Sequence, residues 1–393
     1  MEAYISIGIL FLLGEIFLEL KNKYSNKIGK YLILFLFFFV TGLSYKIHND
    51  YEVYEFIYNI INIENISSME KLIGLNIESG FLHLNLLFKN TLNFDCFKAL
   101  VYLFNTFLIY KGIRSFFDEK KSLFIVTLLY FYGVFYFFYL PSFRQSIGIS
   151  IFIYSLQYIK NKNFIKYVGL ISIACLFHKS CVVLFLVYFF INFFNFNKKI
   201  LSIFLIIDFL NYYFLEEFWV KTFGAIISFI GKFYPSILWN KYFDIASKGS
   251  PREFIFYVFI FGIAILLYSE KEKFYMNGFV IFQIFYFFEK HIPIAYRFAL
   301  FFRIFFIFYL VILLEKINNQ KLKLALKYLT LLFFLLNFNL RFIAKKSQEG
   351  CYIPFHSSLE LLYKDIPYED TAEFIHVQNR NKDPKDFVKR KIK

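Results

Sequence analysis

The sequence is poor in cysteine, and its few cysteines do not stand in pairs. Its 393 residues include Cys96, Cys175, Cys181 and Cys351, whose spacing matches neither a disulfide framework nor the ligand pattern of a zinc site. No internal repeat period is evident along the chain. We therefore expect neither a metal centre nor a disulfide scaffold.

The first apolar segment lacks the small residues of a signal-peptide cleavage site. Glu15, Glu19 and Lys21 occupy its end, where a cleavable signal carries residues such as alanine. We expect the segment to remain as a membrane anchor. Glu15 and Glu19 lie four apart on one helix face, so we expect them to face the bundle or the inner surface and not to take part in chemistry.

Long apolar blocks dominate what the sequence does contain. Hydrophobic residues make up 59% of the chain and the mean hydropathy is +0.53, against roughly 45–50% apolar residues in soluble domains. The abundant Phe and Tyr indicate a compositional bias, and they carry no functional assignment. Blocks that approach the ~20 residues needed to cross a bilayer lie near residues 3–20, 30–46, 95–112, 121–140, 145–160, 163–178, 179–195, 199–216, 253–269, 274–290, 294–315 and 326–341. The sequence predicts an all-α, polytopic integral membrane helical bundle of about 12 transmembrane helices.

Lysine and arginine gather in alternate short loops, which predicts the orientation of the chain. The first such loop carries Lys21, Lys23, Lys27 and Lys30, and five later basic loops fall on the same, cytoplasmic side. The opposite side then carries two larger extracytoplasmic loops, at about 46–94 and 218–252. Topology accounts for much of the net charge of +15, so nucleic-acid binding is not indicated.

A transmembrane domain, residues 1–341, precedes a polar, basic tail, residues 342–393. Twelve crossings place this tail outside, whereas its lysines and arginines favour the inside. One miscounted span would move it, so the sequence leaves its side open.

Polar residues at the outer ends of the predicted spans share one face of the membrane. They are Asp50, Glu78, His83, Arg144, Gln145, His178, Lys179, Glu289, His291 and Arg297. Charges so close to hydrocarbon are costly and mark candidate functional sites. We therefore expect an extracytoplasmic site at the outer leaflet.

Two arginines and a histidine give this set its chemistry. Arg144 and Arg297 can each bind an anionic group in a bidentate manner, as guanidinium does with phosphate, and Gln145 adjoins Arg144. His178 offers a nitrogen suited to general-base work. The set fits metal-independent glycosyl transfer from a polyprenyl-pyrophosphate donor.

Each of these residues has a simpler interpretation. Arg144 and Arg297 could extend to lipid headgroups, and His178 could be an ordinary interfacial histidine. For Asp50, Glu78 and His291 the simpler interpretation, a solvated loop residue, is preferred over contact with the acceptor.

Six short motifs follow one another along the chain. They are Asp50 to Phe56, Glu78-Ser79-Gly80-Phe81, Arg144-Gln145, the His-x-Ser at His178, the Tyr296-Arg297 pair and Tyr352 to Phe355. Together they resemble the EpsG family of exopolysaccharide polymerases, a Wzy-like group of bacterial membrane proteins, and Arg144-Gln145 with the His-x-Ser is the most specific pair. Departures include Ser79 where the family often has proline, Phe355 where it often has tyrosine, and Lys46 where it has arginine.

The resemblance implies a multi-pass polymerase of the bacterial cytoplasmic membrane with an outward-facing active site. It would join undecaprenyl-pyrophosphate-linked oligosaccharides into capsule, O-antigen or exopolysaccharide without a cofactor. Its partners would be that oligosaccharide, membrane lipid, and the flippase and chain-length regulator of the same pathway.

Three further classes of membrane protein remain open. A membrane acyltransferase would need a cytoplasmic donor path and an early catalytic histidine, for which His48 and His83 are poor candidates. A polyprenyl-phosphate-sugar glycosyltransferase would need an acidic base such as Asp50. A lipid-linked oligosaccharide flippase would need charges along a central cavity, whereas charges within the predicted spans are few.

Overall fold

Helices make up most of the structure. The computed structural model describes residues 2–47, 51–64, 66, 68, 77–131, 143–214, 222, 251–291, 295–344 and 356–362. In this part of the chain there are fourteen α-helices and one two-stranded sheet. The helical fold class is confirmed, with one small exception described below.

Each of the twelve predicted spans coincides with a helix. In chain order these are α1 (Glu2–Glu19), α2 (Lys23–Gly42), α6 (Phe94–Arg114), α7 (Glu119–Phe131), α8 (Phe143–Lys160), α9 (Phe164–Phe177), α10 (Leu184–Phe193), α11 (Lys198–Phe214), α14 (Pro251–Leu267), α15 (Lys273–His291), α16 (Ala295–Glu315) and α17 (Gln320–Ala344). The apolar blocks therefore located the helix ends to within about five residues, except at the starts of α2 and α17, and the block 121–140 extends past Phe131 into residues outside the described part.

Two described helices are long and apolar enough, by length and composition, to cross a membrane. They are α6 and residues Arg297–Glu315 of α16, while α9, α10 with the preceding turn, and most of α14 are apolar but shorter. The number of crossings therefore stays a prediction.

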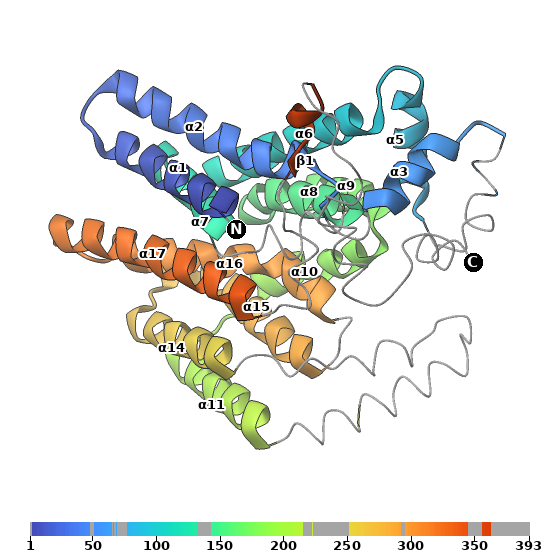
Figure 1. Ribbon diagram of the computed structural model, residues 1–393. Coiled ribbons are helices and arrows are strands. Elements are labelled where there is room, and N and C mark those ends of the chain that lie inside the picture. The colour runs from blue at the N-terminus through green and yellow to red at the C-terminus, as the bar shows by residue number, and fades with distance from the viewer. Residues whose placement is uncertain are drawn as a thin grey trace. The chain divides into compact units, whose positions relative to one another are not determined.

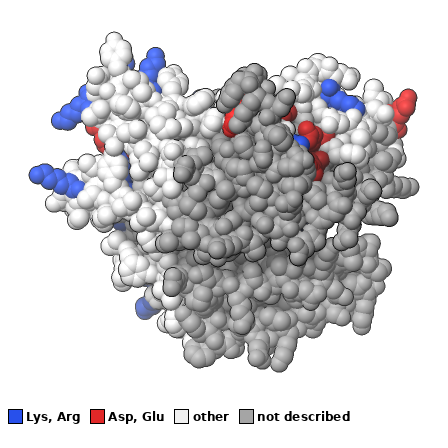
Figure 2. Space-filling model, viewed as in Figure 1, with Lys and Arg blue, Asp and Glu red and all other residues white. Residues whose placement is uncertain are grey.

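Rows of large apolar side chains on several helices face outward. On α6 the exposed row is Leu100, Leu103, Phe104 and Phe107, which follows the spacing of one helix face. Similar rows lie on α1 and α11, and Figure 2 shows that much of the described surface on one face carries no charge. Apolar surface of this extent is typical of a membrane or partner-facing protein.

The chain divides into two compact units, which are described separately. The first comprises residues 1–157, 165–182 and 324–393, and the second comprises residues 158–164 and 183–323. In the second unit α15 packs along α16, α10 packs on α15, and α11 packs on α14. Its core is aromatic, with Tyr257 and Phe306 ring centroids 5.0 Å apart.

In the first unit, α1 and α2 form a closely packed hairpin that also contacts α7. A Cβ atom at Gly29 would lie 2.6 Å from the carbonyl oxygen of Gly14, so glycine permits this approach. Glu15 is fully buried and accepts a hydrogen bond from Thr127 at 2.6 Å. Lys327 of α17 lies 2.9 Å from its other oxygen. Glu15 therefore faces the bundle, as the sequence predicted.

The described part of the predicted loop 46–94 contains two helices, and a short sheet lies just before it. Helix α3 (Tyr51–Ile60) packs against α5 (Ser79–Lys89), and both contact α6, as Figure 1 shows. Strand β1 (Ser44–Tyr45) pairs antiparallel with β2 (His356–Ser357), with Ser44 opposite Ser357. This pair departs from a purely α-helical fold, and it brings a segment of the tail to the end of α2.

Candidate functional site

Glu78 is the residue at which three distant segments of the first unit meet. It precedes α5 in an extended conformation and makes no side-chain bond to cap its own helix. Its Oε2 accepts a hydrogen bond from Nη1 of Arg144, and its Oε1 accepts one from the backbone N–H of Lys179 at 2.9 Å. Nδ1 of His178 lies 3.6 Å from the same Oε1. The carboxylate therefore links the start of α8 to the end of α9.

Arg144 is the second residue of α8, and aromatic rings surround its base. Its Nε lies 3.4 Å from the hydroxyl oxygen of Tyr54, and the guanidinium carbon lies 5.8 Å from the centre of that ring. The preceding residue, Phe143, is buried among the rings of Tyr54, Phe81 and Tyr102. Packing of α3, α5 and α6 around Phe143 thus fixes the start of α8 and the position from which the Arg144 side chain extends.

His178 stands where α9 ends and the chain turns. Its backbone N–H donates to Ala174 at 3.0 Å, and its carbonyl oxygen accepts from Cys181 at 3.0 Å as the 3₁₀ turn Lys179–Val183 begins. This change of helix type leaves the N–H of Lys179 without an intrahelical acceptor, and Glu78 supplies one. The imidazole is largely buried, with 12% of its side chain exposed.

Gly80 allows α5 to approach the end of α9. A Cβ atom there would lie 2.6 Å from the carbonyl oxygen and 2.7 Å from the Cβ of Leu176, which is closer than such atoms pack. Leu176 lies two residues before His178. The close backbone contact at Gly80 therefore brings the carboxylate of Glu78 within hydrogen-bonding distance of Lys179.

The charge on Glu78 is stabilised where it lies. Burial raises the pKa of this carboxyl, but the neighbouring imidazole of His178, the charge of Arg144 and the N–H of Lys179 lower it to about 2. Glu78 is therefore ionised at neutral pH and offsets the positive charge of Arg144, as a buried charge requires.

The structure brings several of the predicted site residues together. Arg144 and His178 share Glu78, and Gln145 lies beside Arg144 with 1% of its surface exposed. The expectation that Glu78 is a solvated loop residue was wrong, because only 7% of it is exposed. Its burial follows from partners 66 and 101 residues away.

Other predicted residues lie elsewhere or outside the described part. His83 is exposed and bonds Ser79 of its own helix at 2.7 Å. Arg297 belongs to α16 in the second unit. Asp50, and the side chains of Glu289 and His291, lie outside the described residues.

Sequence reasoning gave Tyr54 no role, although the structure places it against Arg144. The signal available was the resemblance of the stretch Asp50 to Tyr54 to the family's Asp-x-x-x-Tyr pattern. Tyr54 lies one helical turn after Tyr51 in an amphipathic segment, and this position does not by itself indicate which charged residue it contacts.

The site combines an anion-binding element with a candidate base. A guanidinium at the first turn of α8 adds its charge to the positive end of the helix dipole, which favours phosphate groups. An imidazole that contacts the same carboxylate can exchange a proton with a substrate hydroxyl.

Comparison with known proteins identifies the family of the chain. The model of the EpsG family matches residues 27–357, which include Glu78, Arg144, His178 and Arg297. No curated protein gives a significant match, and no solved structure does. The match covers well over half of the chain, and the chain therefore belongs to the EpsG family of membrane proteins associated with polysaccharide biosynthesis.

Proposed function

We propose that the protein is a polysaccharide polymerase that joins undecaprenyl-pyrophosphate-linked oligosaccharides at the outer leaflet of the bacterial cytoplasmic membrane. The observation that carries the proposal is the convergence of Arg144 and His178 on the carboxylate of Glu78. It places a cation and a proton acceptor side by side, and glycosyl transfer from a pyrophosphate donor needs both.

Arg144 binds the pyrophosphate of the donor. The bond that breaks joins C1 of the donor sugar to a pyrophosphate oxygen, and its electron pair moves onto that oxygen. Positive charge aimed at the departing oxygen stabilises the transition state more than the bound donor. Arg144 supplies this charge together with the N-terminus of α8, and Tyr54 and Glu78 hold the guanidinium in place.

His178 accepts the proton of the acceptor hydroxyl. As the hydroxyl oxygen attacks C1 of the donor sugar, its proton moves to the imidazole and the new glycosidic bond forms. The products are a lipid-linked chain longer by the transferred saccharide and a polyprenyl pyrophosphate. Glu78 sits at Nδ1, so we assign the proton transfer to Nε2.

The orientation predicted from the basic loops supports an outward site. The basic loops favour the cytoplasmic side for the start of α2, and Glu78 belongs to the segment that follows the far end of α2. A flippase that delivers the lipid-linked units and a chain-length regulator are the expected partners.

Substitution of Arg144 tests the proposal. In cells that lack the native gene, the Arg144→Ala variant should reach the membrane at normal abundance but leave single repeat units on the surface in place of a polymer ladder. Arg114→Ala is the matched control, because Arg114 is the exposed last residue of α6 and donates locally, to the carbonyl oxygen of Phe117.

The same gel separates the alternatives. A flippase defect would prevent single units from reaching the surface, and loss of a sugar transferase would shorten the repeat unit itself. A ladder of normal length from Arg144→Ala would overturn the proposed role of Arg144.

A further inference from the structure

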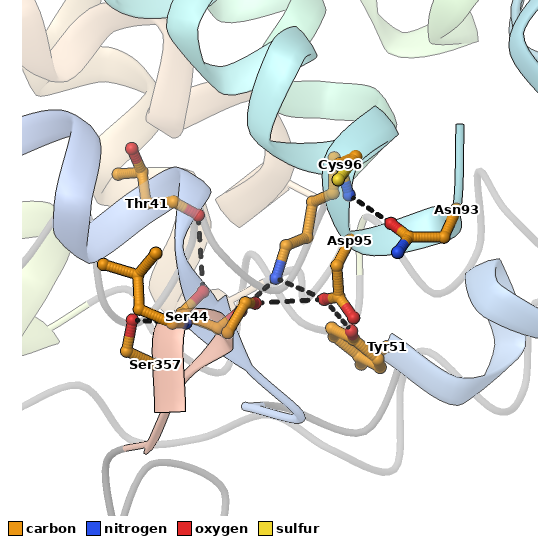
Figure 3. A network of polar contacts seen from close by, with 10 residues as sticks. Thr41, Ser44, Tyr51, Asn93, Asp95, Cys96 and Ser357 are labelled. Atoms are coloured by element: carbon orange, nitrogen blue, oxygen red, sulfur yellow. Dashed lines mark hydrogen bonds and ion pairs between the residues drawn. The ribbon is translucent and has the colours of Figure 1, made fainter. Parts of the chain in front are cut away.

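A second polar cluster in the first unit lies beside the site and takes no part in the proposed reaction (Figure 3). Lys98 of α6 is 5% exposed, donates to the carbonyl oxygen of Ser44, and lies 3.7 Å from Oδ1 of Asp95. The hydroxyl of Tyr51 donates to the same oxygen of Asp95. Asp95 is thus bonded to both a buried cation and a phenol, which join α6 to α3.

A segment from the far end of the chain completes this cluster. Strand β2 pairs with β1, and the N–H of Ser358 donates to the carbonyl oxygen of Leu43 at 2.7 Å. The hydroxyl of Ser358 donates to Oδ1 of Asp95 at 3.1 Å. Residues 356–362 are therefore bonded both to the end of α2 and to the start of α6.

Helix α3 connects this cluster to the candidate site. Tyr51 and Tyr54 lie three residues apart, on one side of α3. Tyr51 bonds Asp95, and Tyr54 contacts the guanidinium of Arg144. The ring of Phe94 provides a second link, since it packs at 5.2 Å on Tyr51 and at 6.4 Å on Phe143, the neighbour of Arg144. Asp95 and Arg144 are therefore linked by contacts through one turn of α3.

The strand pairing also determines the side of the membrane on which residues 356–362 lie. The two ends of a spanning helix are about 30 Å apart, so a segment bonded to Leu43 and Ser44 lies at the same face as the end of α2. An even number of crossings must then separate Ser44 from His356, and the ten predicted spans between them satisfy this condition.

We propose that residues 356–362 form an extracytoplasmic strap that positions α3, and through Tyr54 the guanidinium of Arg144, with Asp95 as the positioning residue. The sidedness of the strap follows from the strand pairing and from the predicted orientation of the chain. Its effect on turnover rests on the proposed function.

Labelling tests the sidedness. In a variant whose four native cysteines are alanine, Leu359→Cys should react with a membrane-impermeant maleimide in intact cells. Ile63→Cys, which is 79% exposed just after α3, is the outward control, and Tyr24→Cys, which is 78% exposed at the start of α2, is the inward control. A peptide tag added after Lys393 and read by antibody in intact cells gives a second measurement. Reaction of Leu359→Cys only after permeabilisation, as at Tyr24→Cys, would overturn the strap.

A double-mutant cycle tests the positioning role. In vesicles supplied with a synthetic polyprenyl-pyrophosphate oligosaccharide, Ser358→Ala should lower the turnover about 3- to 10-fold, equivalent to one net hydrogen bond. In the Arg144→Lys background the same change should have less than about a 2-fold effect, because coupled residues are not additive. Ser115→Ala is the control, since it removes a hydroxyl that bonds Gly112 at the opposite end of α6.

The outcomes separate the two proposals. Equal losses from Ser358→Ala in both backgrounds would show a merely structural contribution and would overturn the strap alone. Full turnover from Arg144→Ala would remove the proposed role of Arg144, and the positioning role with it, but would leave the sidedness result intact.

Discussion

Glu78 accepts a hydrogen bond from the backbone N–H of Lys179 at 2.9 Å, although the two residues lie 101 positions apart. The bond fixes the turn that carries His178, while the other oxygen of the same carboxylate holds Arg144. One side chain thus sets the spacing between the proposed base and the proposed anion-binding group.

Replacing Glu78 by glutamine should destabilise the protein and stop polymerisation. The amide keeps the shape but leaves Arg144 without its counter-charge, and breaking one side of a buried pair typically lowers the free energy of unfolding by about 3–5 kcal/mol. Thermal unfolding in detergent measures this loss. The control is Glu64→Gln, at an exposed position in the same segment, which should unfold as the unmodified protein does.

The stabilising effect of Glu78 should depend on pH in a defined direction. Its pKa is lowered from 4.5 to about 2 in the folded state, so its contribution is complete above pH 4.5 and disappears as the pH falls toward 2. The difference in unfolding temperature between the unmodified protein and Glu78→Gln should be constant from pH 5 to 8 and shrink below that. A difference that already declines between pH 8 and 6 would contradict the role of the ion pair.

Gly80→Ala should impair the site, because the new methyl group would meet the carbonyl oxygen of Leu176. The clashing atom belongs to the backbone of α9 and cannot rotate away as a side chain could, so α5 must shift and displace Glu78. We expect lower thermal stability together with shorter polymer. Gly169→Ala has open space around its methyl group and should be neutral or stabilising by up to about 1 kcal/mol. If Gly80→Ala behaved like Gly169→Ala, the close contact would have no importance.

Substitution of His178 should affect turnover more than abundance. Loss of a general base lowers the rate typically about 10²- to 10⁴-fold. Alanine keeps both backbone hydrogen bonds of His178, so the fold should persist. Turnover in vesicles at matched protein levels measures this effect for His178→Ala. A loss under tenfold would assign the base to another residue.

Arg297 tests a role that rests on the sequence alone. If Arg297 binds pyrophosphate, Arg297→Ala should raise the apparent KM for the lipid-linked donor. Arg297→Lys keeps the charge, so its apparent KM should lie between those of Arg297→Ala and the unmodified protein. Lys271→Ala, at an exposed position in the turn between α14 and α15, is the control. Equal KM values for Arg297→Ala and the control would exclude Arg297 from donor binding.

The sequence located the helices and two of the site residues for clear physical reasons. Apolar blocks identify helices because a bilayer-crossing chain must satisfy its backbone hydrogen bonds internally. Arg144 and His178 were found because a charged or titratable group beside such blocks is costly. Both signals are local in the chain.

The remaining features depend on contacts between distant residues. The family-like Glu78-Ser79-Gly80-Phe81 stretch singled out Glu78, but nothing local predicted that it would be buried while Glu64 is exposed, since its burial comes from partners at α8 and at the end of α9. Tyr54 gains its role in the same way. The β1–β2 pair joins two-residue strands more than 300 positions apart, and two residues carry too little pattern to predict a strand.

The contact between Glu15 and Lys327 has a consequence for how the chain is made. The carboxylate of Glu15 is fully buried on the first helix, and its cationic partner lies on the last. During synthesis α1 and α7 emerge long before α17, so Thr127 is available to Glu15 while Lys327 has yet to be added. The first unit therefore cannot be completed before α17 and residues 356–362 have been synthesised, and in a chain terminated before α17 the carboxylate of Glu15 would lack its cationic partner.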